Sequence, residues 1–289
     1  MKIRNIRSDK VMVKRNLMIK KLTNLIFIVS LVLPFQTFAN KEHKLTKDEI
    51  EYYVLNNKTY SNAVNISQKY GRDLTNLDLR GVYLKDTILS DMNFTNTIFD
   101  LANLSNAYLV NSNLTNTSLK GIDASGTILN RAVLSKANLQ LAWLDEASLI
   151  DSNLTSAKMR GINLSGTNLT RANLTGVDLT GANLKDAILV DANLKNAILT
   201  NANLKNADLT GVNLENSNLK FANFEGATLT QVILKGANIE GADFRRADLR
   251  GADFNNIIFK NTIFKRAKVD LIKGLSEAQE KNLSVLVRE

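Results

Sequence analysis

A large apolar side chain recurs at every fifth position from Leu74 to Val269, and the phase of this pattern never shifts. The forty positions hold twenty-nine Leu and seven Phe, with one Met, one Ile, one Val and one Ala. Two residues before each of them lies a second series of mostly small residues, with Ala at twenty-one of the forty positions. The unit therefore reads A-(N/D)-L-x-x, as in Ala-Asn-Leu-Thr-Gly over residues 172–176.

A period of five fits neither an amphipathic α-helix, which repeats about every 3.6 residues, nor a plain strand, which repeats about every 2. A short extended stretch followed by a bend does fit, because residues two apart then point to the same side. The small and the central residue both face inward, and coils must stack to bury them, about 4.8 Å apart. No proline interrupts the repeats, so no ladder donor is missing. Glycine at the end of many units, such as Gly176, suits a bend with unusual dihedrals.

Runs such as ANLTGVDLTGANLKDAILVDANLKNAIL, over residues 172–199, resemble the pentapeptide-repeat family. The resemblance covers about two-thirds of the chain and holds its phase through all forty units. It implies an all-β solenoid, a right-handed quadrilateral β-helix with four units per coil and hence about ten coils. Some members of the family protect type II topoisomerases by resembling the DNA rod with a strongly acidic surface.

The chain is predicted to have four segments, because both ends of the repeats change composition. These are a secretory signal peptide over 1–39, an N-terminal helical cap over 40–71, the pentapeptide-repeat β-helix over 72–269 and a C-terminal helical cap over 270–289. Capping boxes at residues 46–49 and 276–279 each precede apolar residues at helical spacing. A solenoid leaves its end coils open, so we interpret both helices as caps. The alternative for the C-terminal helix is to join two rods end to end as a homodimer.

The first 39 residues have the three parts of a secretory signal. Lys20 and Lys21 form a charged start, and residues 25–33 form the apolar segment. A small-x-small cleavage site ends at Ala39, so we expect the mature chain to begin at Asn40 and to be periplasmic or secreted. The apolar run is far shorter than the roughly 20 residues that span a bilayer. We therefore expect no stable membrane insertion after cleavage.

The formal net charge of +9 belongs mainly to this leader. Residues 1–39 hold eight Lys or Arg and one acid, whereas residues 40–289 hold 29 Lys or Arg and 27 Asp or Glu. A nearly neutral body provides no electrostatic footprint for a nucleic acid, so we expect no nucleic-acid partner. The body also lacks the acidic excess of a DNA mimic, which leaves a DNA-mimic modulator of a type II topoisomerase as the alternative function.

Few residue types that carry out chemistry are present. The chain has no cysteine and one histidine, His43, which lies outside the repeats. A Ser-His-Asp triad needs an ordered histidine, and a zinc site usually needs several His or Cys ligands. Asp residues before the central position, such as Asp178 and Asp208, follow the repeat pattern and face outward. We therefore predict no catalytic residue, no metal site, no cofactor and no enzymatic activity.

Two departures test the model of the core. Ala124 is too small for the central position, but Ile122 is unusually large for the small position. The exchange of large and small roughly conserves volume, which cores tolerate best. Phenylalanines gather at the ends of the repeats, where we expect stacked rings and a wider solenoid. They are Phe94, Phe99, Phe224, Phe244, Phe254, Phe259 and Phe264.

If four units make a coil, positions twenty apart stack directly, and one face has more apolar outward residues than the others. Its candidate partner-binding stripe comprises Ile88, Tyr108, Val110, Ile128, Ile150, Ile188 and Val190. Charges of alternating sign follow its edge at Arg131, Asp151, Arg171 and Asp191. Exposed apolar stripes mark partner sites, although β-branched residues also simply favour extended backbone. Trp143, on a different face, is either a binding anchor or packed beside Leu141.

Taken together, these features predict an exported, non-enzymatic binding or scaffold protein. Its solenoid faces would contact a protein whose identity the sequence does not provide.

Overall fold

The computed structural model describes residues 45–58, 63–257 and 259–288. The predicted signal peptide, its cleavage site at Ala39 and Asn40, and His43 all lie outside the described residues. The described residues belong to one unit, Leu45–Glu289, which contains the repeats.

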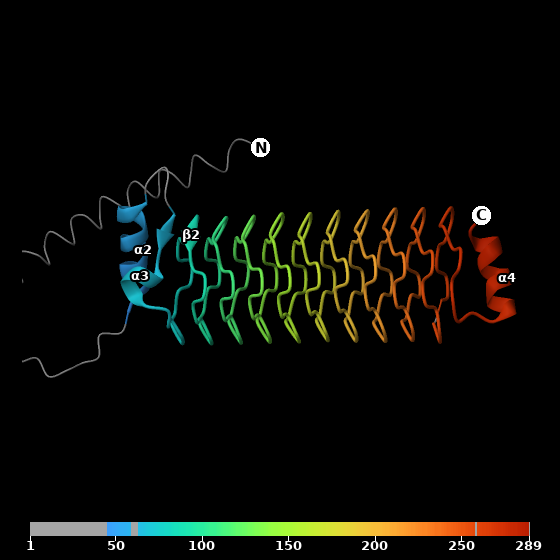
Figure 1. The fold of residues 1–289 in the computed structure, drawn as a ribbon, viewed down its shortest axis with the longest axis horizontal. Coiled ribbons are helices and arrows are strands. Elements are labelled where there is room, and N and C mark those ends of the chain that lie inside the picture. The colour runs from blue at the N-terminus through green and yellow to red at the C-terminus, as the bar shows by residue number, and fades with distance from the viewer. Residues whose placement is uncertain (1–44, 59–62, 258, 289) are drawn as a thin grey trace, which may run out of the picture. The chain divides into compact units, whose positions relative to one another are not determined.

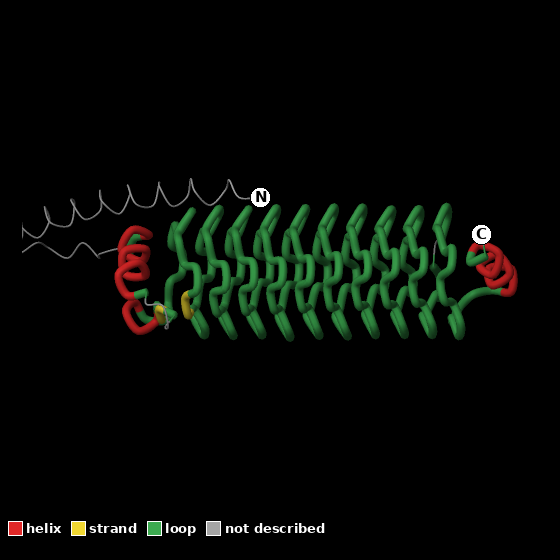
Figure 2. Tube along the Cα trace, turned by 90° about the horizontal axis from the view of Figure 1, so that it is seen from above, coloured by secondary structure: helices red, strands yellow, loops and turns green. Residues whose placement is uncertain are grey.

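Stacked turns of chain form a column between helices α2 (Lys47–Asn57) and α3 (Ser67–Tyr70) at one end and helix α4 (Glu277–Leu286) at the other (Figures 1 and 2). Parallel bridges join residues twenty apart, from Asp73 with Asn93 to Asp253 with Lys273, so each turn contains four five-residue units. Among the described residues, only β1 (Val64–Asn65) and β2 (Thr87–Ile88) are long enough to count as strands, and they pair in parallel. Backbone hydrogen bonds connect successive turns.

The bends between sides use left-handed backbone at every unit. All forty corner residues from 76 to 271 have φ between 54° and 73°. Glycine fills twelve corners, and sixteen of the remaining twenty-eight are Asn or Asp, which tolerate this region better than other residues. The regularity of the coil therefore imposes the left-handed conformation even on residues that avoid it, such as Leu141 and Phe221.

The interior contains the two inward-facing series that the pattern predicts. Leu174 and Ala172 of one unit are both fully buried, and the same is true of most units. Where the small position holds a hydroxyl, that hydroxyl donates to a backbone carbonyl, as from Thr127 Oγ1 to Ala124 O at 2.7 Å. Within the described part of the chain, no buried side-chain polar atom lacks a hydrogen-bond partner.

The exchange at Ile122 and Ala124 is compensated only in part. Both side chains are buried. A cavity of about 20 Å³ nevertheless remains beside them, and eight leucines between Leu104 and Leu144 complete its apolar wall. Isoleucine at the neighbouring position therefore does not fill all the space that a central leucine would occupy.

The predicted stacking of phenylalanine rings is confirmed for Phe224, Phe244 and Phe264 and not for the other four. Phe224 and Phe244 lie parallel with ring centroids 4.7 Å apart, and Phe264 continues the stack at 5.5 Å from Phe244. Phe94 and Phe99, which occupy neighbouring sides of one coil, instead meet edge to face at 5.2 Å. The expected widening of the solenoid at these places stays a prediction.

Helix α2 (Lys47–Asn57) lies at the N-terminal end of the coils and is followed by the short helix α3 (Ser67–Tyr70). The Thr46 hydroxyl and the Glu49 carboxylate form the capping box that the sequence predicts. Ile50 and Val54 are buried in the same apolar cluster as the repeats. Glu51 supplies a polar contact as well, because its Oε1 accepts the Tyr83 N–H at 2.9 Å. One coil later, the equivalent N–H of Asn103 donates to a backbone carbonyl, Val82 O. The Glu51 carboxylate therefore accepts at Tyr83 the hydrogen bond that a backbone carbonyl accepts at Asn103.

Helix α4 (Glu277–Leu286) lies at the other end, and its predicted capping box forms between Ser276 and Gln279. Leu283 is its buried residue, whereas Val285 is 49% exposed. Backbone hydrogen bonding ties the helix to the last coil, since the Arg266 N–H donates to Val287 O at 2.8 Å. None of the helices in the described ranges is long and apolar enough to cross a membrane.

Candidate interaction surface

The structure places all seven residues of the predicted stripe on one face, which we call the Tyr108 face. They occupy two columns, one on each side of the buried central residues. Ile88, Tyr108 and Ile128 bridge one another in successive coils and form the continuous part of the first column. Val110, Ile150 and Val190 lie in the second column at intervals of two coils.

The Tyr108 face is less continuously apolar than the sequence suggests. Tyr108 and Ile188 are 43% and 40% exposed, whereas the other five residues are half-buried. Ser148 and Asn168 separate Ile128 from Ile188 in the first column. The second column alternates with polar residues, and there the Asn130 side chain accepts the Ile150 N–H at 3.1 Å. The exposed apolar surface therefore has two centres, Tyr108 and Ile188, with a polar stretch between them.

One ion pair forms on the charged edge of this face. The Arg171 guanidinium donates to both carboxylate oxygens of Asp151, at 2.7 Å and 2.8 Å. These hydrogen bonds hold the pKa of Asp151 below its usual value. Arg131 and Asp191 extend the alternation on either side, and no ion pair involves them within the described ranges. The edge therefore consists of one ion pair with a further charge on either side.

A second exposed apolar feature was missed by the sequence analysis. Leu101 and Leu141 occupy corners of the same edge two coils apart and are 76% and 67% exposed. Each lies over the glycine of the next coil, since a Cβ built on Gly161 would be only 2.9 Å from Leu141 Cδ2. Trp143, on the adjoining face, is 53% exposed. The signal was present in the sequence as Leu at a corner position, where Gly, Asn and Asp predominate.

Basic neighbours hold several of the surface carboxyl groups in their ionised form. Arg250 hydrogen bonds lower the pKa of Asp248, and the Lys205 ammonium lowers the pKa of Glu225 in the same way. A general acid at neutral pH needs a raised carboxyl pKa, so this direction suits surface ion pairs and not proton transfer. No group of three potential metal-ligating side chains occurs among the described residues.

Comparison with known proteins agrees with this architecture. The family model for pentapeptide repeats matches in eight copies that together span residues 78–261. The chain belongs to the pentapeptide-repeat family, and its solenoid is a right-handed quadrilateral β-helix. Proteins of this family are generally structural or binding proteins and not enzymes.

Several solved structures are similar. HetL, a pentapeptide-repeat protein involved in heterocyst differentiation regulation in the cyanobacterium Nostoc sp. strain PCC 7120, is 31% identical with a TM-score of 0.67, and the match covers 78% of this chain and 97% of HetL. Rfr23 from the cyanobacterium Cyanothece 51142 is 34% identical with a TM-score of 0.38, over 39% of this chain and 91% of Rfr23. QnrB1, a plasmid-mediated fluoroquinolone resistance protein, is 18% identical with a TM-score of 0.43, over 62% of this chain and 91% of QnrB1. No curated protein matches the chain in sequence.

Proposed function

We propose that this chain is an exported, non-enzymatic binding protein that holds a partner protein against the Tyr108 face of its solenoid. About ten coils form the rigid body, and the helices at its two ends act as caps. The partner is a protein of the cell envelope or the extracellular space.

The observation that carries the proposal is the exposure of Tyr108 and Ile188 on one flat, rigid face. A repeat scaffold fixes the spacing of its surface residues, so little conformational entropy of this surface is lost when a partner binds. Tyrosine offers a large contact area and a polar tip, which makes it a frequent anchor in protein interfaces. The Asp151–Arg171 pair at the edge adds polar groups that orient the partner.

Export rests on the leader pattern of the first 39 residues and is tested separately. The native host is fractionated, and the N-terminus of the chain is determined by mass spectrometry. We expect a chain that begins at Asn40 in the periplasmic or secreted fraction. An intact N-terminus in the cytosol would refute export and make inhibition of DNA supercoiling the next assay.

Binding is tested with a photo-reactive amino acid placed on the solenoid in the native host. Incorporation at Tyr108 should crosslink a defined partner, and incorporation at Asn138, on the opposite side of the solenoid, is the matched control. Tyr108→Asp together with Ile188→Asp should abolish the crosslink from a neighbouring site such as Ile128. Thermal unfolding of the double variant must stay close to that of the parent chain. Equal crosslinking from both faces, or binding that survives the double substitution, would contradict the assignment of this face.

A further inference from the structure

The face next to the Tyr108 face has a different character. It consists of the units centred on residues 84 to 264 at intervals of twenty, and we call it the Trp143 face. Parallel bridges link its first outward column without interruption from Tyr83 to Ile263. Any pattern of charge along this face is therefore held at a fixed spacing of about 4.8 Å per coil.

The N-terminal part of the Trp143 face is acidic and includes an exposed aromatic residue. Asp145 follows Trp143 on the same side, and Glu146 occupies the next corner. Asp145 accepts hydrogen bonds from Ser125 Oγ at 3.0 Å and from Asn163 Nδ2 at 3.2 Å. Neither acid forms an ion pair with any lysine or arginine of the described residues. Two charges beside an exposed indole thus lack a counter-charge from their own solenoid.

The C-terminal part of the same face reverses this arrangement. Six coils further on, Lys265 and Arg266 occupy the positions of Asp145 and Glu146, and both are exposed. Neither cation forms an ion pair within the described ranges. Ile263, which is 45% exposed, occupies the position of Trp143. One face therefore has an acidic part and a basic part, each with an exposed apolar residue at the same relative position.

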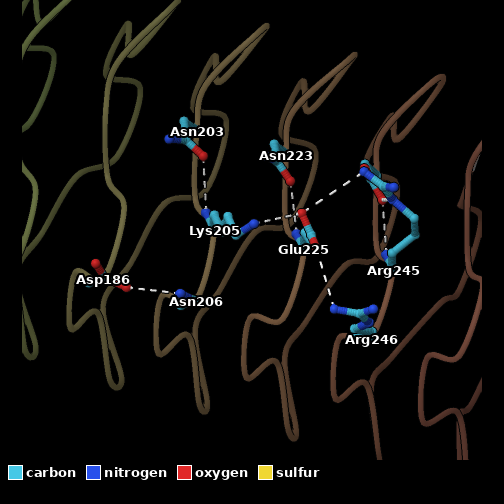
Figure 3. Close-up of polar contacts among 9 residues, drawn as sticks. Asp186, Asn203, Lys205, Asn206, Asn223, Glu225, Arg245 and Arg246 are labelled. Atoms are coloured by element: carbon cyan, nitrogen blue, oxygen red, sulfur yellow. Dashed lines mark hydrogen bonds and ion pairs between the residues drawn. The ribbon is translucent and has the colours of Figure 1, made fainter.

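The middle of the face is polar and ordered (Figure 3). Lys205 Nζ lies 2.9 Å from Glu225 Oε2, and the Lys205 N–H donates to Asn203 Oδ1 at 3.3 Å. Arg245 and Arg246 both approach Glu225 at 3.9 Å. Residues 202–206 lie midway between the acidic and the basic part, three coils from each.

We propose that two copies of this chain pair through their Trp143 faces, antiparallel, around a two-fold axis at residues 202–206. Such an axis lies in the plane of the interface, at right angles to the long axes of both solenoids. It keeps each column of residues opposite the same column of the second copy and reverses the order of the coils. A residue one, two or three coils before residues 202–206 then meets the residue the same number of coils after them.

This register matches charge with opposite charge and apolar with apolar. The opposed residues are Trp143 with Ile263, Asp145 with Lys265, Glu146 with Arg266, and Lys185 with Glu225. One like-charged contact remains at the axis, where Lys205 meets Lys205, and each of these is already paired with Glu225 of its own chain. Parallel pairing has no such match, because an axis along the column leaves the acidic parts opposite each other. Charge complementarity of this kind determines orientation and register in protein interfaces.

The size of the overlap sets the expected strength. Seven coils take part, from Trp143 to Ile263, over about 34 Å, and five residues span at most about 16 Å across the face. Each copy then buries about 500 Å², which is at the low end for a specific interface. Ion pairs at such an edge are screened by salt. The dimer should therefore be reversible and salt-sensitive. In this arrangement the Tyr108 faces of both copies lie on the same side of the dimer.

Sedimentation velocity on the chain, purified after expression with its leader, tests this proposal. We expect a monomer–dimer equilibrium at micromolar concentration in about 50 mM salt, weakened at least tenfold in about 500 mM salt. Asp145→Lys with Glu146→Lys should produce a monomer, and Lys265→Glu with Arg266→Glu should do the same. Mixing these two variants should restore a heterodimer, because each reversed part then meets its opposite. Loss of folding alone cannot produce this rescue.

A matched control changes two lysines of another face, Lys120→Glu with Lys158→Glu, and should leave the dimer intact. The chain has no cysteine, so single cysteines allow a clean crosslinking test of orientation. A short bismaleimide should join two Asn203→Cys chains but not two Asn103→Cys chains. A monomer at about 100 µM, a mixture without rescue, or crosslinking at both positions would overturn the proposal. The proposal would also be overturned if Val285→Lys in α4 abolished the dimer while the charge reversals left the dimer unchanged.

Discussion

One column of interior positions contains both a cavity and a stack of aromatic rings. Ala124 occupies this column next to the cavity, and five coils later the same column holds the stack of Phe224, Phe244 and Phe264. Parallel bridges join successive coils at both places. The backbone ladder therefore fixes the direction of each inward side chain, whereas the filling of the interior depends on the side chains within about one coil.

The polar contacts of the surface aspartates also differ between these two regions. Around the phenylalanine stack, Asp243 and Asp248 each bind an arginine two residues later, at 2.6 Å and 2.7 Å. Beside the cavity, the Asp123 carboxylate accepts hydrogen bonds from Asn103 and Ser125 instead. We therefore expect the C-terminal coils to be the more stable part, and four substitutions test this.

Phe244→Ala should have the largest effect, a loss of about 3–5 kcal/mol in the free energy of unfolding. Phe244 is fully buried between two parallel rings, so its removal creates a large cavity and ends both contacts. Urea unfolding followed by circular dichroism measures the change. Phe244→Leu, which restores the common residue of this position, should lose clearly less. Equal losses for the two variants would show that stacking adds nothing to packing here.

Thr127→Val should destabilise the chain by about 1 kcal/mol in the same assay. The Thr127 hydroxyl is buried beside the cavity and donates to Ala124 O at 2.7 Å, and valine has the same shape without the donor. Thr127→Ser keeps the hydroxyl and is the control for the donor. A valine variant as stable as the parent would mean that this hydrogen bond is not needed in the loosely packed coil.

Ala124→Val should stabilise the chain by about 0.5 kcal/mol, because two additional methyl groups occupy part of the cavity. The matched substitution Ala182→Val, at a buried small position away from the cavity lining, should instead destabilise it through overpacking. A loss of stability at both positions would indicate that the coil around Ala124 has no usable space in solution.

Asp248→Asn should have the smallest effect, about 0.2–0.5 kcal/mol near neutral pH. Arg250 hydrogen bonds lower the pKa of Asp248 in the folded chain. Its contribution is therefore present above the unfolded pKa of about 3.9 and is lost as the pH falls through the lower folded value. Unfolding at a series of pH values should show a weaker dependence below about pH 4 in the variant. An unchanged profile would mean that the pair contributes nothing.

Much of the fold was predictable, because the information is local or strictly periodic. A leucine at every fifth position predicts the inward series, and the capping boxes at Thr46 and Ser276 each lie within four consecutive residues. The exposed stripe was predicted only in outline. Ser148 and Asn168 interrupt it, and how much of Ile128 or Ile150 reaches the surface depends on the side chains of adjoining coils.

The sequence by itself therefore determined the repeat, its inward and outward series, the family and the helices at both ends. The tertiary structure alone decided which N–H of the first coils Glu51 accepts, how much space Ala124 leaves, and how much of Leu101 and Leu141 is exposed. The physical reason is distance along the chain. A contact between coils joins residues about twenty apart, and its fit depends on several side chains at once, which a pattern of single positions does not contain.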